Sequence, residues 1–177
     1  RGADGARPAP RFQALRYEPA AGWTTWKVLD RDGANRQVEP YLSSLGGGES
    51  GTGIVASPEF AVEADSISMT LCGHDAMGGG GKKNFVALVD AASKETLRTT
   101  YAPLSDAMKD ASWDVRDLRG RRVRFEAHDG DSGTAFAWMG VGRIDAGPAL
   151  RVDFRQGLPA GWTSTTPKIA VRTEPVG

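Results

Sequence analysis

Alternation of apolar and polar residues with a period of two constrains the fold of this chain more than any other feature. In "SISMTL" (66–71), Ile67, Met69 and Leu71 are separated by Ser and Thr. "RRVRFEAHD" (121–129) alternates in the same way, with apolar residues between charged ones. A period of two is typical of a strand that buries one face and exposes the other. Both segments are therefore predicted to be half-buried strands.

Two further segments are expected to be strands of the same core. "NFVALVD" (84–90) is apolar at nearly every position and is bounded by turn residues, which predicts a strand covered on both sides. "AFAWMGVGRI" places Met139 and Val141 on one face, and Phe136 and Trp138 on the other beside two glycines. Small residues next to an aromatic ring indicate a face that a ligand can approach closely.

Turns rich in Gly and Pro separate these strands, and their number indicates the fold class. The chain has 177 residues with 23 Gly and 10 Pro, and only residues 105–110 suggest a helical turn. Many short strands spaced by glycine-rich turns are typical of an antiparallel β-sandwich. We therefore expect an all-β fold, in its jelly-roll form.

The chain is expected to contain one such module. Residues 1–10 predict a linker, residues 11–145 the β-sandwich, and residues 146–177 either a closing strand or the start of a second, truncated repeat, because "GWT" at 161–163 repeats 22–24. Since the chain opens on Arg rather than Met, we expect a piece of a longer protein. No run approaches the roughly 18–20 apolar residues of a membrane helix, so no membrane insertion is predicted.

The charge balance argues against nucleic-acid binding. Lys and Arg together number 22, as do Asp and Glu, so the formal net charge is zero. The segment 115–124 holds five arginines, but Asp114 and Asp117 lie among them, and a solvated turn is favoured over a nucleic-acid patch. The single cysteine, Cys72, excludes an internal disulfide and a paired-cysteine zinc site.

The segment "GDSG" (130–133) matches four fifths of the signature around the nucleophile of chymotrypsin-like proteases. Position 134 is Thr rather than the second glycine, and the chain is too short for the two barrels of that fold. A polar turn is favoured, which is expected to bring His128 and Trp138 onto one face. The remaining enzymatic alternative is a hydrolase built from His74, His128 and Asp131. The chain is predicted to be non-catalytic.

Two other glycine-containing segments resemble functional motifs but do not match their required residues. "GESGT" (48–52) ends in Thr where a nucleophile elbow needs Gly. "GGGGKK" (78–83) lacks the first glycine and the final Ser or Thr of a phosphate-binding loop, and it predicts a mobile surface loop.

Oxygen-rich loops make calcium a candidate cofactor. Asp30, Asp32 and Asn35 share one loop, and Asp129 and Asp131 share another. Hard oxygen ligands separated by glycine suit calcium, although Asx turns use the same residues without a metal. His74 and His128, together with Asp129 and Asp131, also allow a transition-metal site if their strands are neighbours, but two solvent-facing histidines at strand ends are favoured.

The order of the motifs resembles a known family. A "G-x-G-x-x-x-S-P-x-F" segment is followed by an "aspartate-x-isoleucine" strand, a valine-leucine-valine strand ending in aspartate, a "W-D-V" segment and "L-x-G-x-x-V". The matching residues are Gly51, Gly53, Ser57, Pro58, Phe60, Asp65, Ile67, Val86, Leu88, Val89, Asp90, Trp113, Asp114, Val115, Leu118, Gly120 and Val123.

Over residues 22–144 this order resembles the galactose-binding-like jelly-roll modules attached to bacterial polysaccharide-degrading enzymes, including levanase-type glycoside hydrolases, and blocks in large secreted multidomain bacterial proteins. The resemblance implies a carbohydrate-binding β-sandwich, sometimes with structural calcium, no catalysis, and an extracellular or periplasmic location. The chain departs from the pattern in the His74 loop and at 136–138, where "FAW" replaces a glycine-tryptophan-rich stretch.

The leading hypothesis is therefore a non-catalytic carbohydrate-binding module. Aromatic rings stack on sugar CH faces, and polar side chains bond the hydroxyls. The predicted ligand-binding residues are Trp138, Phe136, Arg124, His128, His74 and Asn84. Two alternatives stay open: Trp138 as a core tryptophan, and a spacer module that docks neighbouring domains of the parent protein and binds no sugar.

Overall fold

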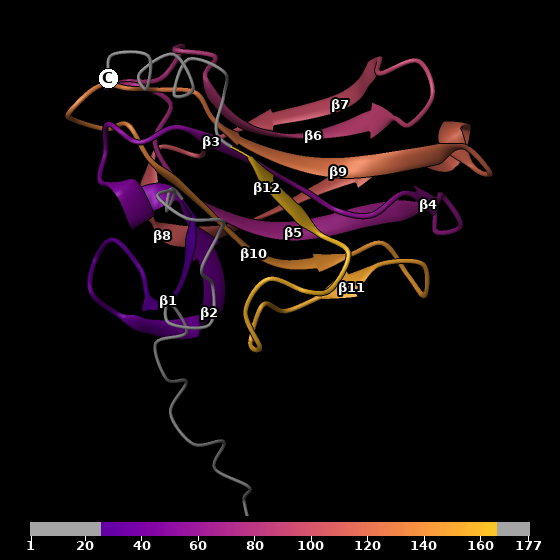
Figure 1. Ribbon diagram of the computed structural model, residues 1–177, viewed down its shortest axis with the longest axis horizontal. Helices are drawn as coiled ribbons and strands as arrows, with labels where there is room; N and C mark the ends of the chain where they lie inside the picture. Colours follow the sequence, from indigo (N-terminus) through magenta and orange to yellow (C-terminus); the bar gives the residue numbers. More distant parts are fainter. Residues whose placement is uncertain (1–25, 166–177) are drawn as a thin grey trace, which may run out of the picture.

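Two antiparallel sheets stack face to face in the computed structural model, which describes residues 26–165 (Figure 1). Sheet A holds β1 (Lys27–Arg31), β2 (Gln37–Ser43), β5 (Ser66–Gly73), β8 (Ser105–Asp114), β10 (Met139–Asp145) and β11 (Arg151–Val152). Sheet B holds β3 (Gly53–Ala56), β4 (Phe60–Ala61), β6 (Asn84–Asp90), β7 (Thr96–Tyr101), β9 (Arg122–Asp129) and β12 (Thr163–Thr165). Two short 3₁₀ turns, η2 (Ser44–Gly47) and η3 (Arg116–Leu118), join strands. In this part of the chain no helix is long and apolar enough to cross a membrane.

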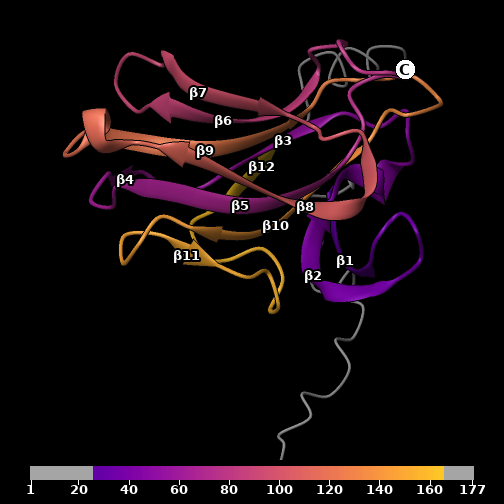
Figure 2. The ribbon, with the colours of Figure 1, turned by 180° about the vertical axis from the view of Figure 1, so that it is seen from behind.

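The strand order is that of a jelly roll. Sheet A runs β1-β2-β10-β5-β8, with β11 also beside β10; sheet B runs β12-β3-β9-β6-β7, with β4 also beside β9. The chain passes between the sheets repeatedly, so that β2-β10-β5-β8 faces β3-β9-β6-β7. Eight strands in this double Greek-key arrangement define the jelly roll. The predicted fold class is confirmed, and Figure 2 shows the same two layers from behind.

The period-two segments bury the predicted faces between the sheets. Ile67, Met69 and Leu71 of β5 are at most 2% exposed, and so are the apolar residues of β9 opposite them. Full burial of each such side chain stabilises the fold by roughly 1.5–3 kcal/mol, which outweighs local preferences. "NFVALVD" forms β6 and is buried at five of its seven positions.

Two expected elements differ from the structure. The strand expected over "AFAWMGVGRI" (135–144) begins only at Met139, and residues 135–138 belong to the preceding loop. Residues 105–110 form the first part of β8 rather than a helical turn. β8 pairs antiparallel with β5, from Ser66 opposite Asp114 to Leu71 opposite Lys109. The ladder bonds to β5 override the helix preference of Ala, Met and Lys in this segment.

Residues after β10 also join the sandwich: β11 pairs with β10, and β12 pairs with β3. The predicted linker 1–10 and the first "GWT" copy lie outside the described residues.

A bulge interrupts β10. Val141 lies opposite Leu71 and Ile144 opposite Met69, so two residues of β10, Gly142 and Arg143, face the single residue between them on β5. Val141 and Ile144 both reach the core, at 1% and 0% exposed. The extra residue therefore leaves Gly142 and Arg143 together on the other side of the sheet, because bulges re-aim side chains in this way.

Candidate functional site

Loops from both sheets meet at one end of the sandwich, here called the loop end: residues 44–52, 74–83, 102–104 and 130–138, on the left in Figure 1. The loops bond one another directly. The amide of His74 donates to the carbonyl of Trp138 at 2.8 Å, and the amide of Gly130 donates to the carbonyl of Lys83 at 2.9 Å. The amide of Ala137 donates to Glu49 Oε2 at 3.3 Å.

Asp75 ties down the glycine-rich loop. Its carboxylate is buried and accepts the backbone amides of Lys82, Lys83 and Asn84 at 2.7–3.0 Å. Three amide donors satisfy both carboxylate oxygens, which offsets the cost of burying the charge. The segment 78–81 lies at the surface, as expected. The end of the loop that carries it is held by hydrogen bonds to the Asp75 carboxylate, which the expectation of a mobile loop did not include.

Asn84 holds two loops together. It is fully buried; its Nδ2 donates to the His74 carbonyl at 2.8 Å, and its Oδ1 accepts the Gly130 amide at 3.2 Å. Both ends of the amide are thus occupied by the protein. The structure gives Asn84 a positioning role in place of the predicted ligand contact.

Three aromatic side chains predicted to act together do lie together. The His74 ring meets Phe136 edge-on with centroids 5.0 Å apart, and it meets Trp138 at 6.0 Å. The Nε2 of His74 bonds Asp106 Oδ1 at 2.9 Å. The loop-end cluster consists of His74, Asp106, Phe136 and Trp138, and it draws on two loops and the start of β8.

Trp138 is buried within this cluster. Its side chain packs with Tyr41 and Cys72 and is 6% exposed. Gly33, in the β1–β2 turn, covers the ring so closely that a Cβ at position 33 would lie 2.9 Å from Trp138. The ring has no open face for a sugar. The alternative of a packing tryptophan is the one that the structure supports, although the ring lies on the outer side of sheet A rather than between the sheets.

Phe136 is the exposed ring of the cluster. It is 40% exposed, and its backbone adopts φ +55°, the left-handed region that bulky residues rarely occupy. Such a conformation costs about 1–3 kcal/mol, and residues held in it cluster at functional sites. Leu104 at the same end shares both features, at φ +59° and 46% exposed, so the aromatic ring is what makes Phe136 the candidate binding residue.

Arg124 and His128 lie on a different surface. Both project from the outer face of sheet B, where Glu126 accepts a bond from Arg124 Nη2 and one from His128 Nε2, each at 2.8 Å. The His128 bond is the main cause that lowers the pKa of Glu126, with Arg124 adding to it. His128 also stacks on Phe85, with centroids 4.5 Å apart. The expectation that His128 and Trp138 share one face is wrong, because their strands belong to opposite sheets.

Each histidine bonds a carboxylate, as the base of a catalytic triad does, but neither bonds Ser132. His74 bonds Asp106 and His128 bonds Glu126, while Ser132 is an exposed turn residue. The turn around it is built by Asp131, which receives the Gly133 amide at 2.9 Å. Within residues 26–165 no hydrogen bond joins His74, His128 and Asp131, the residues of the hydrolase alternative, to one another.

The two oxygen-rich loops differ in what they leave open. Asp32 Oδ1 accepts the amides of Ala34 and Arg36, and Oδ2 accepts Arg36 Nε. Burial raises the pKa of Asp32, but these bonds outweigh that effect and hold it below its usual value. This is the arrangement of an Asx turn.

Asp129 is the less satisfied carboxylate. It is 1% exposed, its Oδ1 accepts the Asp131 amide at 3.1 Å, and its Oδ2 has no partner. Burial raises its pKa to about 7, and the nearby Ser44 hydroxyl and Asp131 amide offset only part of that rise. Over the described residues no three His, Cys, Asp or Glu side chains are grouped to hold a metal ion. Calcium stays a prediction, with one free carboxylate oxygen in its favour.

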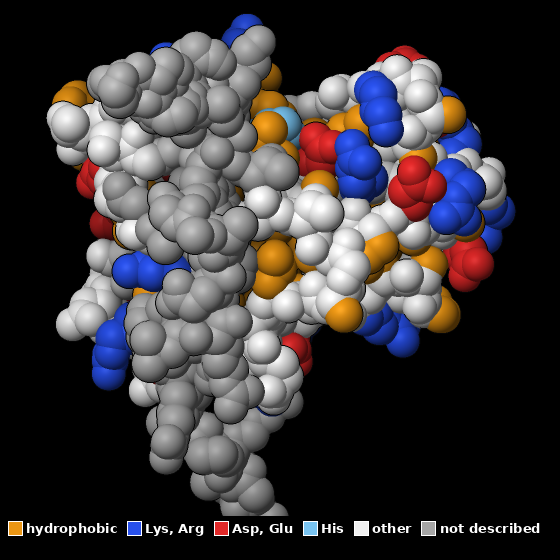
Figure 3. Space-filling view, in the orientation of Figure 1, with side chains coloured by type: hydrophobic (Ala, Val, Ile, Leu, Met, Phe, Trp, Pro, Cys, Tyr) orange, Lys and Arg blue, Asp and Glu red, His pale blue; other side chains and the backbone are white. Residues whose placement is uncertain are grey.

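The arginine-rich segment lies at the end opposite the loop end. Each of its five arginines pairs with a carboxylate: Arg116 with Asp114, Arg119 with Asp65, Arg121 with Asp90, Arg122 with Glu59 and Arg124 with Glu126. Figure 3 shows basic and acidic side chains interspersed over the right-hand end of the view. No uncompensated basic patch for a nucleic acid forms from these arginines.

Comparisons with known proteins assign the chain to no family. No family model matches the sequence, and no curated protein matches it. Among solved structures, the chain is similar to the C-terminal extracellular domain of Mycobacterium tuberculosis EmbC, with a TM-score of 0.40 and 13% identity. The match covers 77% of this chain and 57% of that one.

Proposed function

We propose that this chain is a non-catalytic carbohydrate-binding module of a larger secreted protein and that it holds a glycan at the loop end. The observation that carries the proposal is Phe136, an exposed aromatic ring on strained backbone, braced edge-on by His74. Fixing a ring in this way lowers the entropy that a ligand must overcome, because the ring is already in place.

The neighbours of Phe136 supply the polar contacts that a sugar needs. Asp106, whose side chain is 56% exposed, offers carboxylate oxygen to hydroxyl groups, and Asp131 lies on the same loop as the ring. Sugars bind where an apolar face meets such acceptors, since their CH faces stack and their hydroxyls donate. Buried Asn84 and Asp75 keep the loops in place, and Trp138 supports them from below.

A spacer or docking module is the second candidate. The loop end also exposes Met77 at 74% and Leu104 at 46%, and exposed apolar side chains are typical anchors of protein interfaces. In that case a neighbouring domain of the parent protein, rather than a glycan, would cover Phe136.

Affinity gel electrophoresis with soluble polysaccharides tests the proposal. A glycan that retards the unsubstituted chain should no longer retard the Phe136→Ala variant. The melting temperature of the variant should stay within about 3 °C of that of the unsubstituted chain. Tyr101→Ala is the matched control, because Tyr101 is 42% exposed but lies on sheet B. If no glycan retards the unsubstituted chain while a neighbouring domain of the larger protein binds it through Phe136, the spacer function is correct and the glycan proposal is wrong.

A further inference from the structure

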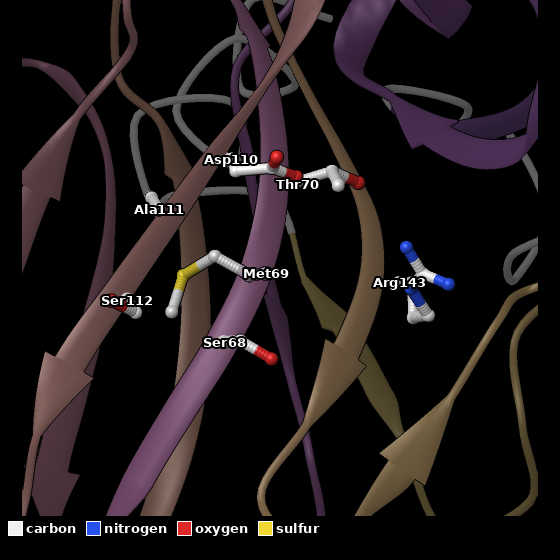
Figure 4. Close-up of a pocket in the computed structure, with 7 residues that line it drawn as sticks. All are labelled: Ser68, Met69, Thr70, Asp110, Ala111, Ser112 and Arg143. Carbon is white, nitrogen blue, oxygen red and sulfur yellow. The ribbon is translucent and has the colours of Figure 1, made fainter.

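A polar groove crosses the outer face of sheet A, away from the loop-end cluster. It encloses about 270 Å³ and is lined by Ser68, Met69, Thr70, Asp110, Ala111, Ser112 and Arg143 (Figure 4). Pockets for drug-sized ligands measure about 300–1,000 Å³, so this groove suits a single sugar unit.

The strand register orders the polar side chains in two rows. In the first row Asp110 of β8 lies opposite Thr70 of β5, which faces the bulge carrying Arg143 on β10. In the second row Ser112 lies opposite Ser68, which lies opposite Asp145. The first row thus offers an acceptor, a hydroxyl and a cation across three neighbouring strands, each about 4.8 Å from the next.

The bulge in β10 places the Arg143 guanidinium on the outer face of sheet A. With a regular register Arg143 would point into the core, but the extra residue places it outside together with Gly142. A Cβ at Gly142 would lie 2.1 Å from Thr70 Oγ1 and 2.8 Å from Met108 Cε, so only glycine fits at this point of the sheet. Gly142 therefore keeps Thr70 close to β10 while Arg143 borders the groove.

Arg143 differs from the other arginines of residues 26–165 in making no hydrogen bond or close ion pair there, although its charge helps to lower the pKa of Asp145. Ten others, including Arg98, Arg151 and Arg155, bond a carboxylate or a carbonyl of residues 26–165. Asp145, the nearest acidic group on β10, is engaged by Arg151 and by the Gly147 amide. The hydrogen-bond donors of the Arg143 guanidinium are therefore available to an anion from outside.

We propose that this groove binds a carboxylate-bearing sugar unit, a hexuronate, within an acidic polysaccharide, at a site separate from the loop end. The planar guanidinium of Arg143 matches a carboxylate through two parallel bonds. Ser68, Thr70 and Ser112 both donate to and accept from ring hydroxyls, and Asp110 accepts from them. An acidic protein segment fits less well, because the three hydroxyl side chains of the groove would find matching hydroxyl groups on a sugar ring but only carboxylates on Asp and Glu side chains.

Titration calorimetry with polygalacturonate, a neutral galactan and poly-glutamate tests this site. Arg143→Gln should weaken polygalacturonate binding at least tenfold, as expected for the loss of a hydrogen-bonded charge pair. Arg119→Gln removes the same charge at the far end of the sandwich and should change binding less than about twofold. Amide chemical shifts on adding galacturonate should move at residues 68–70, 110–112 and 142–145, which reports on the site even if a variant unfolds.

The outcomes separate this inference from the loop-end proposal. Retardation by a neutral glycan that depends on Phe136, without any binding of polygalacturonate, supports the loop-end site and overturns the groove. Equal losses in Arg143→Gln and Arg119→Gln overturn the groove as well, because they show attraction to net charge alone. Poly-glutamate bound as tightly as polygalacturonate would assign the groove to a protein partner.

Discussion

Asp129→Asn should remove a pH dependence of stability that a single buried carboxyl creates. Asp129 is 1% exposed with Oδ2 unpartnered, and burial raises its pKa from 3.8 to about 7. Between about pH 4 and pH 7 the folded protein therefore holds a proton that the unfolded chain has lost. The contribution of Asp129 to the free energy of unfolding is therefore fully present below about pH 4, is lost as the pH rises to about 7, and does not change above that pH.

The size of the effect follows from the same shift in pKa. A rise of about three pH units at about 1.4 kcal/mol per unit gives an upper value of about 4 kcal/mol. Asparagine stays neutral at every pH and keeps the oxygen that accepts the Asp131 amide. The variant should match the parent protein near pH 4 and exceed its stability by about 2–4 kcal/mol at pH 8.

Urea unfolding followed by tryptophan fluorescence, at pH values from 4 to 8, measures this difference. Asp110→Asn is the matched control, because Asp110 is exposed, and its profile should run parallel to that of the parent protein. Equal slopes against pH for the parent protein and Asp129→Asn would refute the reasoning, since Asp129 would then titrate alike in the folded and unfolded chains.

Three more results are expected. Trp138→Ala should lower the free energy of unfolding by about 3–5 kcal/mol, because the ring fills the space against Tyr41 and Cys72; chemical denaturation measures it, and a loss under about 1 kcal/mol would contradict the packing role. The Cys72 thiol is fully buried, and burial raises its pKa to about 12, so it should react with a disulfide reagent only after unfolding; fast reaction in the folded state would contradict this. If calcium binds through Asp129 and Asp131, EDTA should lower the melting temperature and added calcium should restore it, whereas an unchanged melting curve would remove calcium as a cofactor.

Regular alternation made the core strands predictable, and contacts between distant segments made the binding surfaces unpredictable. β5 and β9 follow their patterns because one face of each is buried, and a slip by one residue would expose all of it. Alternation also placed Trp138 outside sheet A correctly. It carried no information about Gly33, which lies more than a hundred residues earlier in the chain and covers the ring.

The groove was missed for a related reason. A strict period of two puts Arg143 inside, and only the pairing of β10 with β5 reveals the extra residue. The same limit applies to residues 105–110, whose composition favours a helix until β5 is available as a partner. Phe136 and His74, by contrast, were selected as ring and polar residue by chemistry alone, and the loops do bring them together.

The central place of β10 in sheet A also bears on how the chain is made. Among the strands of residues 26–165, β10 is the last long one to be synthesised, yet it lies between β2 and β5 and joins β1 and β2 to the rest of sheet A. Until residues 139–145 emerge, β2 and β5 each present an unpaired edge. Chains dominated by such remote pairings fold slowly and are prone to aggregate while incomplete. Protection of the nascent chain therefore matters for most of its synthesis, and fragments that end before Asp145 should accumulate as insoluble protein.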